Sequence, residues 1–472
     1  MKKFSFFLCL CLLLLPAVPA HAAALAAEDI ISDSAILIDA ATGQVLYEKN
    51  GSKRMYPAST TKIMTALLAV ENTRPYELAT VSESAIAIAE PDSANVALRP
   101  GERVPIESAI YALMLPSAND AANVLAEYIA GSQENFSKLM NEKAARIGAE
   151  NTHFTNAHGL HDPDHYTTAS DMAMITRYAM RNADFAQYFG TSHYTMAPTN
   201  LQPQERPFTN YQYMLVSTTD LYNPAVIGGK VGYTGEAQHT MATVATKNGR
   251  TLICVVMHSP HRLNKFSDTE KLLDYGFEGF YTYTIPSRDF SERAVPIGAG
   301  GNPRGSASFR LSEDVTLLLP NDVTPFDLQV DYNLPASLES EEEAAGSVSL
   351  RLRASTARTL PPILLDIPLE ASVEMDSVPA AATLSSTLNA SGSAVSSMLG
   401  RVFSHTAAWI ALVLAGVLLL FILTAAARNH SLKKRRRQRE ARLARRSRAN
   451  APVYKPVPRA SRVDIYSANR YR

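Results

Sequence analysis

Residues 240–259, TMATVATKNGRTLICVVMHS, limit most strongly what this chain can fold into. Asn248-Gly249 separates two apolar runs, and Asn-Gly in such a place is the strongest short-range signal for a β-hairpin. A second hairpin is predicted over residues 35–50, AILIDAATGQVLYEKN, where apolar and polar positions alternate on both sides of Ala41-Thr42-Gly43. Antiparallel strands are therefore expected at both ends of a long region.

Between the two hairpins the apolar spacing is mainly helical. Strands at both ends with helices between them predict a mixed α+β domain over residues 28–285, with a sheet that is at least partly antiparallel. Two helices are expected to end at Gly131 and Gly148, because glycine readily adopts the left-handed conformation that closes a helix. The spacing predicts helices over residues 59–71, 107–115, 120–130, 133–147, 170–181 and 268–277.

After Pro286 the pattern of apolar and polar residues changes. Short alternating runs are separated by proline, glycine and acidic clusters, which predicts a small all-β domain over residues 286–375. Residues 376–404 are rich in serine and alanine without a firm period and are interpreted as a linker. The four runs are DVTLLLP, DLQVDYNL, SVSLRLRAS and ILLDIPL.

Both ends of the chain carry apolar segments that differ in length. Residues 1–22 combine two lysines, a short apolar run and a small-residue triplet, and this order predicts a secretory signal peptide. Residues 406–427 contain no charge and are long enough to span a bilayer, so a transmembrane helix is expected there. The basic tail, 428–472, is then predicted to be cytoplasmic and the part between the two segments extracytoplasmic.

The formal net charge of zero conceals a strong asymmetry. Residues 4–427 carry 27 basic and 43 acidic side chains, which argues against a nucleic-acid partner for that part. The basic run after the apolar segment is better suited to anionic lipid than to RNA. Once the signal peptide is removed, Cys254 has no partner within the chain, so the fold is expected to contain no intrachain disulfide.

Ser59-Thr60-Thr61-Lys62 stands at the start of a predicted helix. Serine and lysine three residues apart share a helix face, so a lysine with a lowered pKa can act as a general base toward the serine hydroxyl. The amino end of the helix also supplies N–H groups for a developing oxyanion. Taken alone, the pattern also fits a serine that caps the helix and a lysine in solvent.

Two further short motifs follow along the chain. Ser117-Ala118-Asn119 lies on a predicted tight connection between helices, where a hydroxyl and an amide can face a cleft or can cap the next helix. Lys230-Val231-Gly232 lies within GGKVGYTGE, a predicted strand with four glycines. Because glycine weakens a strand, these positions are expected to let a ligand approach the backbone.

Ser-x-x-Lys, Ser-x-Asn and Lys-Thr-Gly together are the signature of penicillin-binding proteins and class A β-lactamases. This chain has the first two, with Lys-Val-Gly as the third, and residues 36–280 resemble the serine-type D-alanyl-D-alanine carboxypeptidases, low-molecular-weight penicillin-binding proteins of the peptidase S11 family. The resemblance extends through PASTTKIMTALLAVE, LPSANDAANVLAEYIAGS, NAHGLHDPDHYTTASDMA and LLDYGF. It implies a β-lactamase/transpeptidase-like domain with the site between a helical subdomain and an antiparallel sheet.

The resemblance also implies the roles of individual residues. Ser59 is the expected nucleophile, Lys62 its base, and Ser117 the proton relay to the leaving D-alanine. Asn119, Lys230, Gly232, Tyr233 and Thr234 are expected to bind substrate, with the backbone N–H groups of Ser59 and Tyr233 as the oxyanion hole. The implied reaction removes the terminal D-alanine from peptidoglycan stem pentapeptides without a metal or cofactor, and β-lactam antibiotics are the expected acylating inhibitors.

Two positions depart from the family pattern. Val231 replaces a hydroxyl-bearing residue that helps to bind the substrate carboxylate, and loss of one hydrogen bond to a charged group costs about 1.5 to 3 kcal/mol. Residues 236–238, Glu-Ala-Gln, stand where relatives commonly have Ala-Gly. An anchored homologue that binds cell-wall peptide with little or no turnover is therefore the alternative hypothesis.

Two other enzyme classes were weighed. A class A β-lactamase needs a glutamate that holds the deacylating water, and no Glu-x-x-Leu-Asn lies between Ser117 and Lys230. A zinc peptidase is suggested by residues 153–165, HFTNAHGLHDPDH, but their spacing matches no common zinc signature. Neither class accounts for the three motifs as well as a serine D,D-peptidase does.

Overall fold

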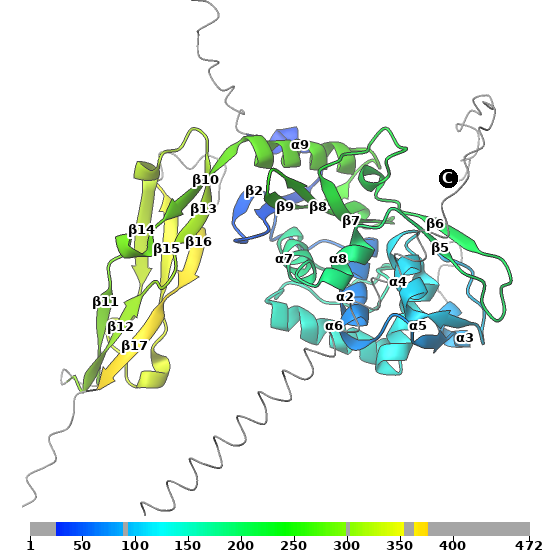
Figure 1. Ribbon diagram of the computed structural model, residues 1–472, viewed down its shortest axis with the longest axis horizontal. Coiled ribbons are helices and arrows are strands. Elements are labelled where there is room, and N and C mark those ends of the chain that lie inside the picture. Colours follow the sequence, from blue (N-terminus) through cyan, green and yellow to red (C-terminus); the bar gives the residue numbers. More distant parts are fainter. Residues whose placement is uncertain (1–24, 88–92, 299–302, 354–362, 376–472) are drawn as a thin grey trace, which may run out of the picture. The chain divides into compact units, whose positions relative to one another are not determined.

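The computed structural model describes residues 25–87, 93–298, 303–353 and 363–375 (Figure 1). The predicted signal peptide, linker, transmembrane segment and basic tail all lie outside these residues. Within the described ranges, no helix combines the length and the apolar character needed to cross a membrane.

A five-stranded antiparallel sheet forms the centre of the larger α+β part. Its strand order is β2-β1-β9-β8-β7, so β7 is an edge strand. At the turn between β8 and β9, Asn248 and Gly249 both have positive φ, of 53° and 80°, as the predicted Asn-Gly hairpin requires. The strands are β1 (Ser34–Asp39), β2 (Val45–Lys49), β7 (Val226–Thr234), β8 (Gln238–Lys247) and β9 (Arg250–Ser259).

Helices cover both faces of this sheet. Helix α9 (Asn264–Glu278) packs on one face, and α7 (Ala169–Ala179) and α8 (Ala183–Phe189) pack on the other (Figure 1). Along β9, Ile253 belongs to the core beneath the helical layer, whereas the next residue, Cys254, belongs to the core beneath α9. Because successive strand residues point to opposite faces, a sheet buried on both sides has the nearly continuous apolar run seen in this hairpin.

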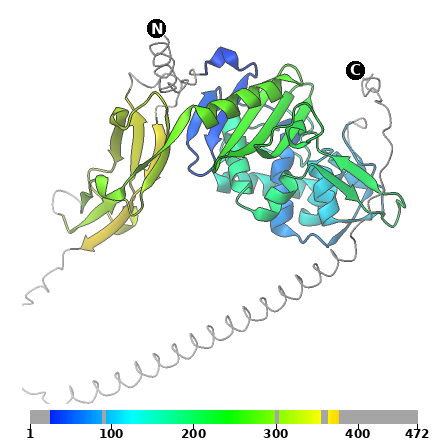
Figure 2. The ribbon, with the colours of Figure 1, turned by 45° about the horizontal axis from the view of Figure 1, so that its top comes forward.

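The remaining helices form a subdomain beside the sheet (Figure 2). The spacing predicted α6 at its observed bounds, and Gly131 and Gly148 close α5 and α6 in the left-handed conformation, as expected. The subdomain contains α2 (Lys62–Asn72), α3 (Glu83–Ile86), α4 (Ile106–Met114), α5 (Asn119–Ala130), α6 (Gln133–Ile147) and the hairpin β3 (Leu78–Thr80) and β4 (Arg103–Pro105).

Several elements differ from the sequence prediction. The helix expected over residues 59–71 begins with a 3-10 turn, Ala58–Thr61, and α2 starts only at Lys62. Helix α9 is longer than predicted, and α8 was not predicted at all. A second unpredicted feature is the hairpin β5 (His193–Met196) and β6 (Arg206–Thr209), which lies between α8 and the central sheet in the sequence.

Strands dominate the chain after α9. The four predicted runs correspond to β13 (Val315–Pro320), β14 (Leu328–Asn333), β15 (Ser347–Leu352) and β16 (Ile363–Pro368). Strand β10 (Phe280–Ile285), which the sequence placed in the first domain, pairs with β13. Strands β11 (Arg293–Ile297), β12 (Gly305–Arg310) and β17 (Glu370–Met375) form a separate sheet.

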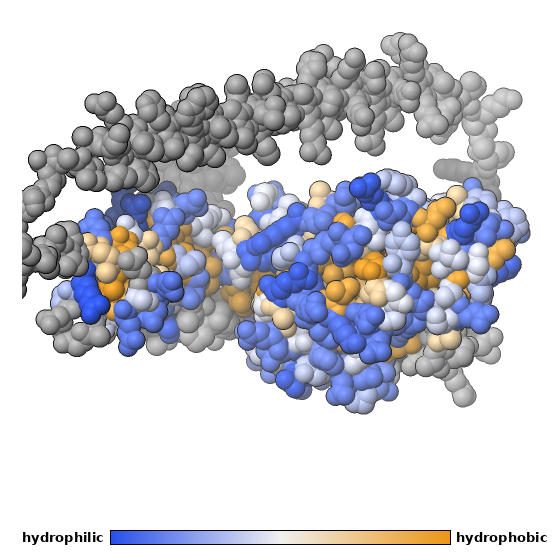
Figure 3. Space-filling view, turned by 90° about the horizontal axis from the view of Figure 1, so that it is seen from below, coloured by the Kyte–Doolittle hydropathy of each residue, from blue (hydrophilic) through white to orange (hydrophobic). Residues whose placement is uncertain are grey.

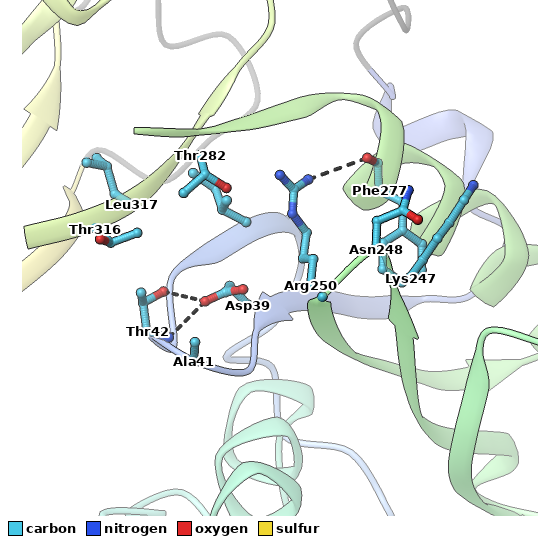
Figure 4. Close-up of a pocket in the computed structure, with 12 residues that line it drawn as sticks. Asp39, Ala41, Thr42, Lys247, Asn248, Arg250, Phe277, Thr282, Thr316 and Leu317 are labelled. Carbon is cyan, nitrogen blue, oxygen red and sulfur yellow. Dashed lines mark hydrogen bonds between the residues drawn. The ribbon is translucent and has the colours of Figure 1, made fainter. Parts of the chain in front are cut away.

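A cavity of about 420 Å³ lies where the turns of the two hairpins meet β10 and β13 (Figure 4). Its polar groups are already engaged: Asp39 accepts hydrogen bonds from the N–H and hydroxyl of Thr42, and Arg250 donates to the carbonyls of Gly276, Phe277 and Phe280. These bonds fasten turns, so we assign the cavity a structural role. On the face seen in Figure 3, hydrophilic residues cover most of the described surface and apolar residues form separate patches.

Candidate active site

The predicted site residues come together around one cleft of about 520 Å³. The 3-10 turn before α2, the connection before α5 and the edge strand β7 each contribute to its lining. Lys62 and Lys230 lie directly behind this lining and are almost fully buried. The cleft is lined by Ser59, Ser117, Asn119, Gly232, Tyr233 and Thr234 among the predicted residues.

Ser59 and Lys62 are in direct contact. The Lys62 ammonium or amine nitrogen, Nζ, lies 3.0 Å from Ser59 Oγ, across the 3-10 turn that ends at Thr61. Ser59 itself is half-buried, and the residue before it, Ala58, has a φ of 48°. A positive φ is unfavourable for alanine, and such local strain is often found at functional sites.

The surroundings of Lys62 favour its neutral form. Burial lowers the pKa of Lys62 well below its ordinary value, the charge of Lys230 lowers it further, and Asp120 acts in the opposite direction. Lys62 Nζ also donates to Asn119 Oδ1 and to the carbonyl of His158, both at 2.6 Å. A neutral amine held this close to a serine hydroxyl can accept its proton.

Ser117 and Asn119 occupy the turn between α4 and α5. Asn119 is the first residue of α5, and its Nδ2 donates to Ser93 Oγ at 2.9 Å. Ser117 has a φ of 66°, and its buried Oγ has no hydrogen-bond partner among the described residues. Since buried hydroxyls are normally paired, the Ser117 hydroxyl is available to a group that enters the cleft.

Strand β7 brings Lys230 and Tyr233 to the other wall. Burial, and then the charge of Lys265, lower the pKa of Lys230 to about 7. Its Nζ donates to the carbonyl of Val231 at 3.1 Å. Tyr233 is 59% exposed and its ring lies 4.6 Å from that of His239. The Thr234 hydroxyl accepts a hydrogen bond from the backbone of Ala237.

The glycines of β7 do not all serve the purpose predicted from the sequence. A Cβ on Gly232 would lie 2.7 Å from the backbone nitrogen of Ser59, so the strand passes directly beside Ser59. A Cβ on Gly228 or Gly229 would instead collide with Phe189 or Gln212. The expectation that these two glycines open the strand to a ligand is therefore wrong, because protein side chains fill that space.

The two departures from the family pattern take different places. Val231 is 9% exposed and belongs to the apolar cluster that also contains Met241 and Phe266, yet it also lines the cleft. Glu236 lies on the turn between β7 and β8, and its side chain lines a neighbouring pocket rather than the cleft. The Glu236 side chain therefore does not narrow the cleft.

Sequence reasoning missed two cations in the cleft, Arg262 and Lys265. Burial, and then the charge of Arg262, lower the pKa of Lys265 to about 8. A signal was available: His239 pairs with Ser259 across the β8–β9 hairpin, so the residues that follow Ser259 return to the end of the sheet where Tyr233 lies. Basic residues just after that hairpin were therefore placed near the predicted site.

The histidine-rich loop engages several different partners. His165 Nε2 is 2.8 Å from Thr61 Oγ1, and His158 Nδ1 accepts from the backbone of Leu160. Burial lowers the pKa of both His158 and His165 to about 3. In the described part of the chain, no three histidine, cysteine, aspartate or glutamate side chains are placed to hold a metal ion.

Comparison with known proteins agrees with this geometry. The D-alanyl-D-alanine carboxypeptidase family, peptidase S11, matches residues 20–261. D-alanyl-D-alanine carboxypeptidase DacF of Bacillus subtilis is 31% identical over 322 residues, covering 66% of this chain and 79% of that protein. DacA of Escherichia coli is 29% identical over 350 residues, covering 71% of this chain and 83% of its own length.

The fold agrees as well. The crystal structure of penicillin binding protein 5 from Haemophilus influenzae superposes with a TM-score of 0.57 at 26% identity, covering 74% of this chain and 97% of that one. This likeness confirms the predicted α+β, transpeptidase-like fold. With the serine, lysine and cleft described above, these matches show that the chain belongs to the D-alanyl-D-alanine carboxypeptidases of the S11 family, which are serine hydrolases.

Proposed function

We propose that this chain removes the terminal D-alanine from peptidoglycan stem pentapeptides through an acyl-enzyme on Ser59. The observation that carries the proposal is the contact of Ser59 Oγ with Lys62 Nζ, a buried amine whose pKa is strongly lowered. In this step neutral Lys62 takes the hydroxyl proton while Oγ attacks the carbonyl between the two D-alanines. The S11 family membership supports this reaction.

The negative charge of the tetrahedral intermediate is assigned to the backbone N–H groups of Ser59 and Tyr233. The tight approach of Gly232 to the nitrogen of Ser59 supports this assignment, because it brings β7 alongside the nucleophile. Preorganised N–H donors of this kind typically contribute about 3 to 4 kcal/mol to catalysis. Asn119 accepts a hydrogen bond from Lys62 and also lines the cleft, where it is assigned to hold the substrate peptide.

Ser117 completes proton transfer in the proposed mechanism. Its buried hydroxyl passes a proton to the amine of the leaving D-alanine while protonated Lys62 returns the Ser59 proton to Ser117 Oγ. The C–N bond breaks to leave the acyl-enzyme and a neutral Lys62. Water then hydrolyses the ester, with Lys62 again as the base, and Ser59 is regenerated. Penicillins acylate the same hydroxyl.

Three cations attract the terminal carboxylate of the substrate in this proposal. Lys230 lies behind the cleft, and Lys265 and Arg262 line it. Their positive charge attracts the carboxylate even though Val231 has no hydroxyl that could donate a hydrogen bond to it. Thr234 also lines the cleft, and its hydroxyl proton is available because its oxygen is the acceptor for Ala237.

We extend the proposal to cellular placement. A signal peptide at residues 1–22, a membrane helix at 406–427 and a cytoplasmic tail at 428–472 would hold the peptidase domain, 28–285, outside the membrane. The small β-rich domain, 286–375, and the linker, 376–404, would separate it from the bilayer. Such a location suits a role in cell-wall biogenesis and cell shape.

The alternative is a wall-peptide-binding homologue with little turnover, and Val231 is the observation that favours it. Labelling of the full chain with a fluorescent penicillin, beside Ser59→Ala, separates the two. We expect labelling of the wild type, none of Ser59→Ala, and normal labelling of Ser52→Ala, an exposed serine outside the cleft.

Release of D-alanine from a pentapeptide is the second measurement. We expect Ser59→Ala to reduce it by more than about 1,000-fold, because the acyl-enzyme cannot form. A wild-type chain that folds but neither labels nor releases D-alanine would remove the acylating mechanism and leave the binding homologue.

A further inference from the structure

A second pocket, here called the side pocket, lies next to the cleft and has a volume of about 420 Å³. It shares no lining residue with the cleft and contains none of the residues assigned to catalysis. Acidic, basic and aromatic side chains all contribute to it. The side pocket is lined by Arg54, Met55, Tyr56, Pro163, Asp164, Tyr166, Glu236 and His258.

Three chain segments run directly from the cleft into the side pocket. Gly235 lines the cleft and the next residue, Glu236, lines the side pocket. Leu160 lines the cleft, and Asp164, further along the histidine-rich loop, lines the side pocket. The third segment leads from Ser59 back to Tyr56. Because three separate segments make this passage, the side pocket continues one end of the cleft.

The substrate backbone runs toward the end of the cleft that the side pocket continues, and this step rests on the proposed function. Lys230 precedes Tyr233 on β7, and the charge of Lys265 acts on Lys230, so the terminal carboxylate is drawn to the side of Lys230. The peptide upstream of the reacting carbonyl must extend the other way, past Gly235. One extended residue advances about 3.3 Å, so the residue before the acylating D-alanine lies about one strand position beyond Tyr233, and a long side chain from there extends past Gly235 toward Glu236.

The side pocket offers charges of both signs. Asp164 and Glu236 supply two exposed carboxylates. The guanidinium of Arg54 lies 4.4 Å above the ring centre of Tyr166, an arrangement that leaves its N–H edge free to donate. His258 Nδ1 lies 2.7 Å from Asp33 Oδ2, so the His258 side chain is also held in place.

We propose that the side pocket binds the zwitterionic side-chain end of a diamino-dicarboxylic acid in the stem peptide, at the position before the two D-alanines. Its ammonium is placed between Glu236 and Asp164, and its carboxylate meets Arg54. A lysine at that position has the ammonium without the carboxylate, so it keeps the contacts with Glu236 and Asp164 and loses the contact with Arg54. Glu236 is then a specificity-determining residue of the carboxypeptidase reaction.

Titration calorimetry with the full-length Ser59→Ala chain tests the proposal without turnover. Three pentapeptides are compared, with 2,6-diaminopimelate, L-lysine or side-chain-acetylated L-lysine at the third position. We expect the diaminopimelate peptide to bind tightest, and Kd to rise about tenfold or more for the acetylated peptide, since it lacks both charges.

Variants in the same Ser59→Ala background separate the contacts. Glu236→Gln is expected to remove most of the advantage of a free amine, and Arg54→Gln the advantage of diaminopimelate over lysine. The matched control Glu150→Gln changes an exposed carboxylate outside both pockets and is expected to retain the wild-type order.

Equal Kd values for the three peptides, absence of binding, or an unchanged order in Glu236→Gln would overturn the proposal. Release of D-alanine by the wild type from a blocked dipeptide, which lacks the third residue, is measured in parallel. Failure of that release counts against the proposed carboxypeptidase reaction, whereas the calorimetric order still reports on the side pocket.

Discussion

Restoring the hydroxyl that is missing at position 231 gives the sharpest test of catalysis. Valine and threonine have similar shapes, so Val231→Thr replaces one methyl group by a hydroxyl with little change in side-chain shape. Val231 lines the cleft, and the new hydroxyl can therefore donate to the substrate carboxylate. One hydrogen bond to a charged group is worth about 1.5 to 3 kcal/mol, which predicts a rise in kcat/KM of about 10-fold to over 100-fold.

The same substitution has a cost that the structure makes explicit. Val231 is only 9% exposed and belongs to an apolar cluster, so the hydroxyl must be partly buried in the free protein. We expect the free energy of unfolding to fall by about 1 to 2 kcal/mol. For a domain of this size that corresponds to a decrease in Tm of about 2 to 8 °C.

The matched control is Val226→Thr, on the same strand, in the same apolar cluster and 6% exposed, but outside the cleft. It should lose comparable stability and gain no activity. The assay is release of D-alanine from a pentapeptide, with thermal unfolding measured in parallel. If Val231→Thr leaves kcat/KM within about twofold of the wild type, the argument from the missing hydroxyl is refuted.

Two further predictions follow from the cations and from the strand beside the nucleophile. The pKa values of about 7 for Lys230 and about 8 for Lys265 predict that kcat/KM falls as pH rises through this range, because both side chains lose the charge that attracts the carboxylate. Lys265→Arg keeps its charge and should make the decline above pH 8 shallower, whereas an identical pH profile would exclude a role for this charge. Gly232→Ala should lower the rate of penicillin acylation at least tenfold, because a Cβ would press on the nitrogen of Ser59. Gly228→Ala, on the same strand but outside the cleft, crowds Phe189 instead and is the control, so an equal loss of acylation in the two variants would contradict the proposed oxyanion hole.

Local patterns predicted much of the fold. The Asn-Gly hairpin, the bounds of α6 and the glycine that ends it depend on backbone preferences of neighbouring residues, and these operate in any context. The contact between Ser59 and Lys62 belongs to the same class, since three residues of helical backbone bring the two side chains together. Helix α8 and the β5–β6 hairpin were missed because their short segments have no comparably strong local signal.

The sequence by itself therefore determined the antiparallel hairpins, most helices and the contact between Ser59 and Lys62. Only the tertiary structure decided the environment of Lys62: Asn119 and the carbonyl of His158 reach it across 57 and 96 residues of chain. It also placed Lys265 in the cleft and Glu236 in the side pocket. The physical reason is that burial and charge coupling depend on which surfaces pack together, and no short stretch of sequence contains that information.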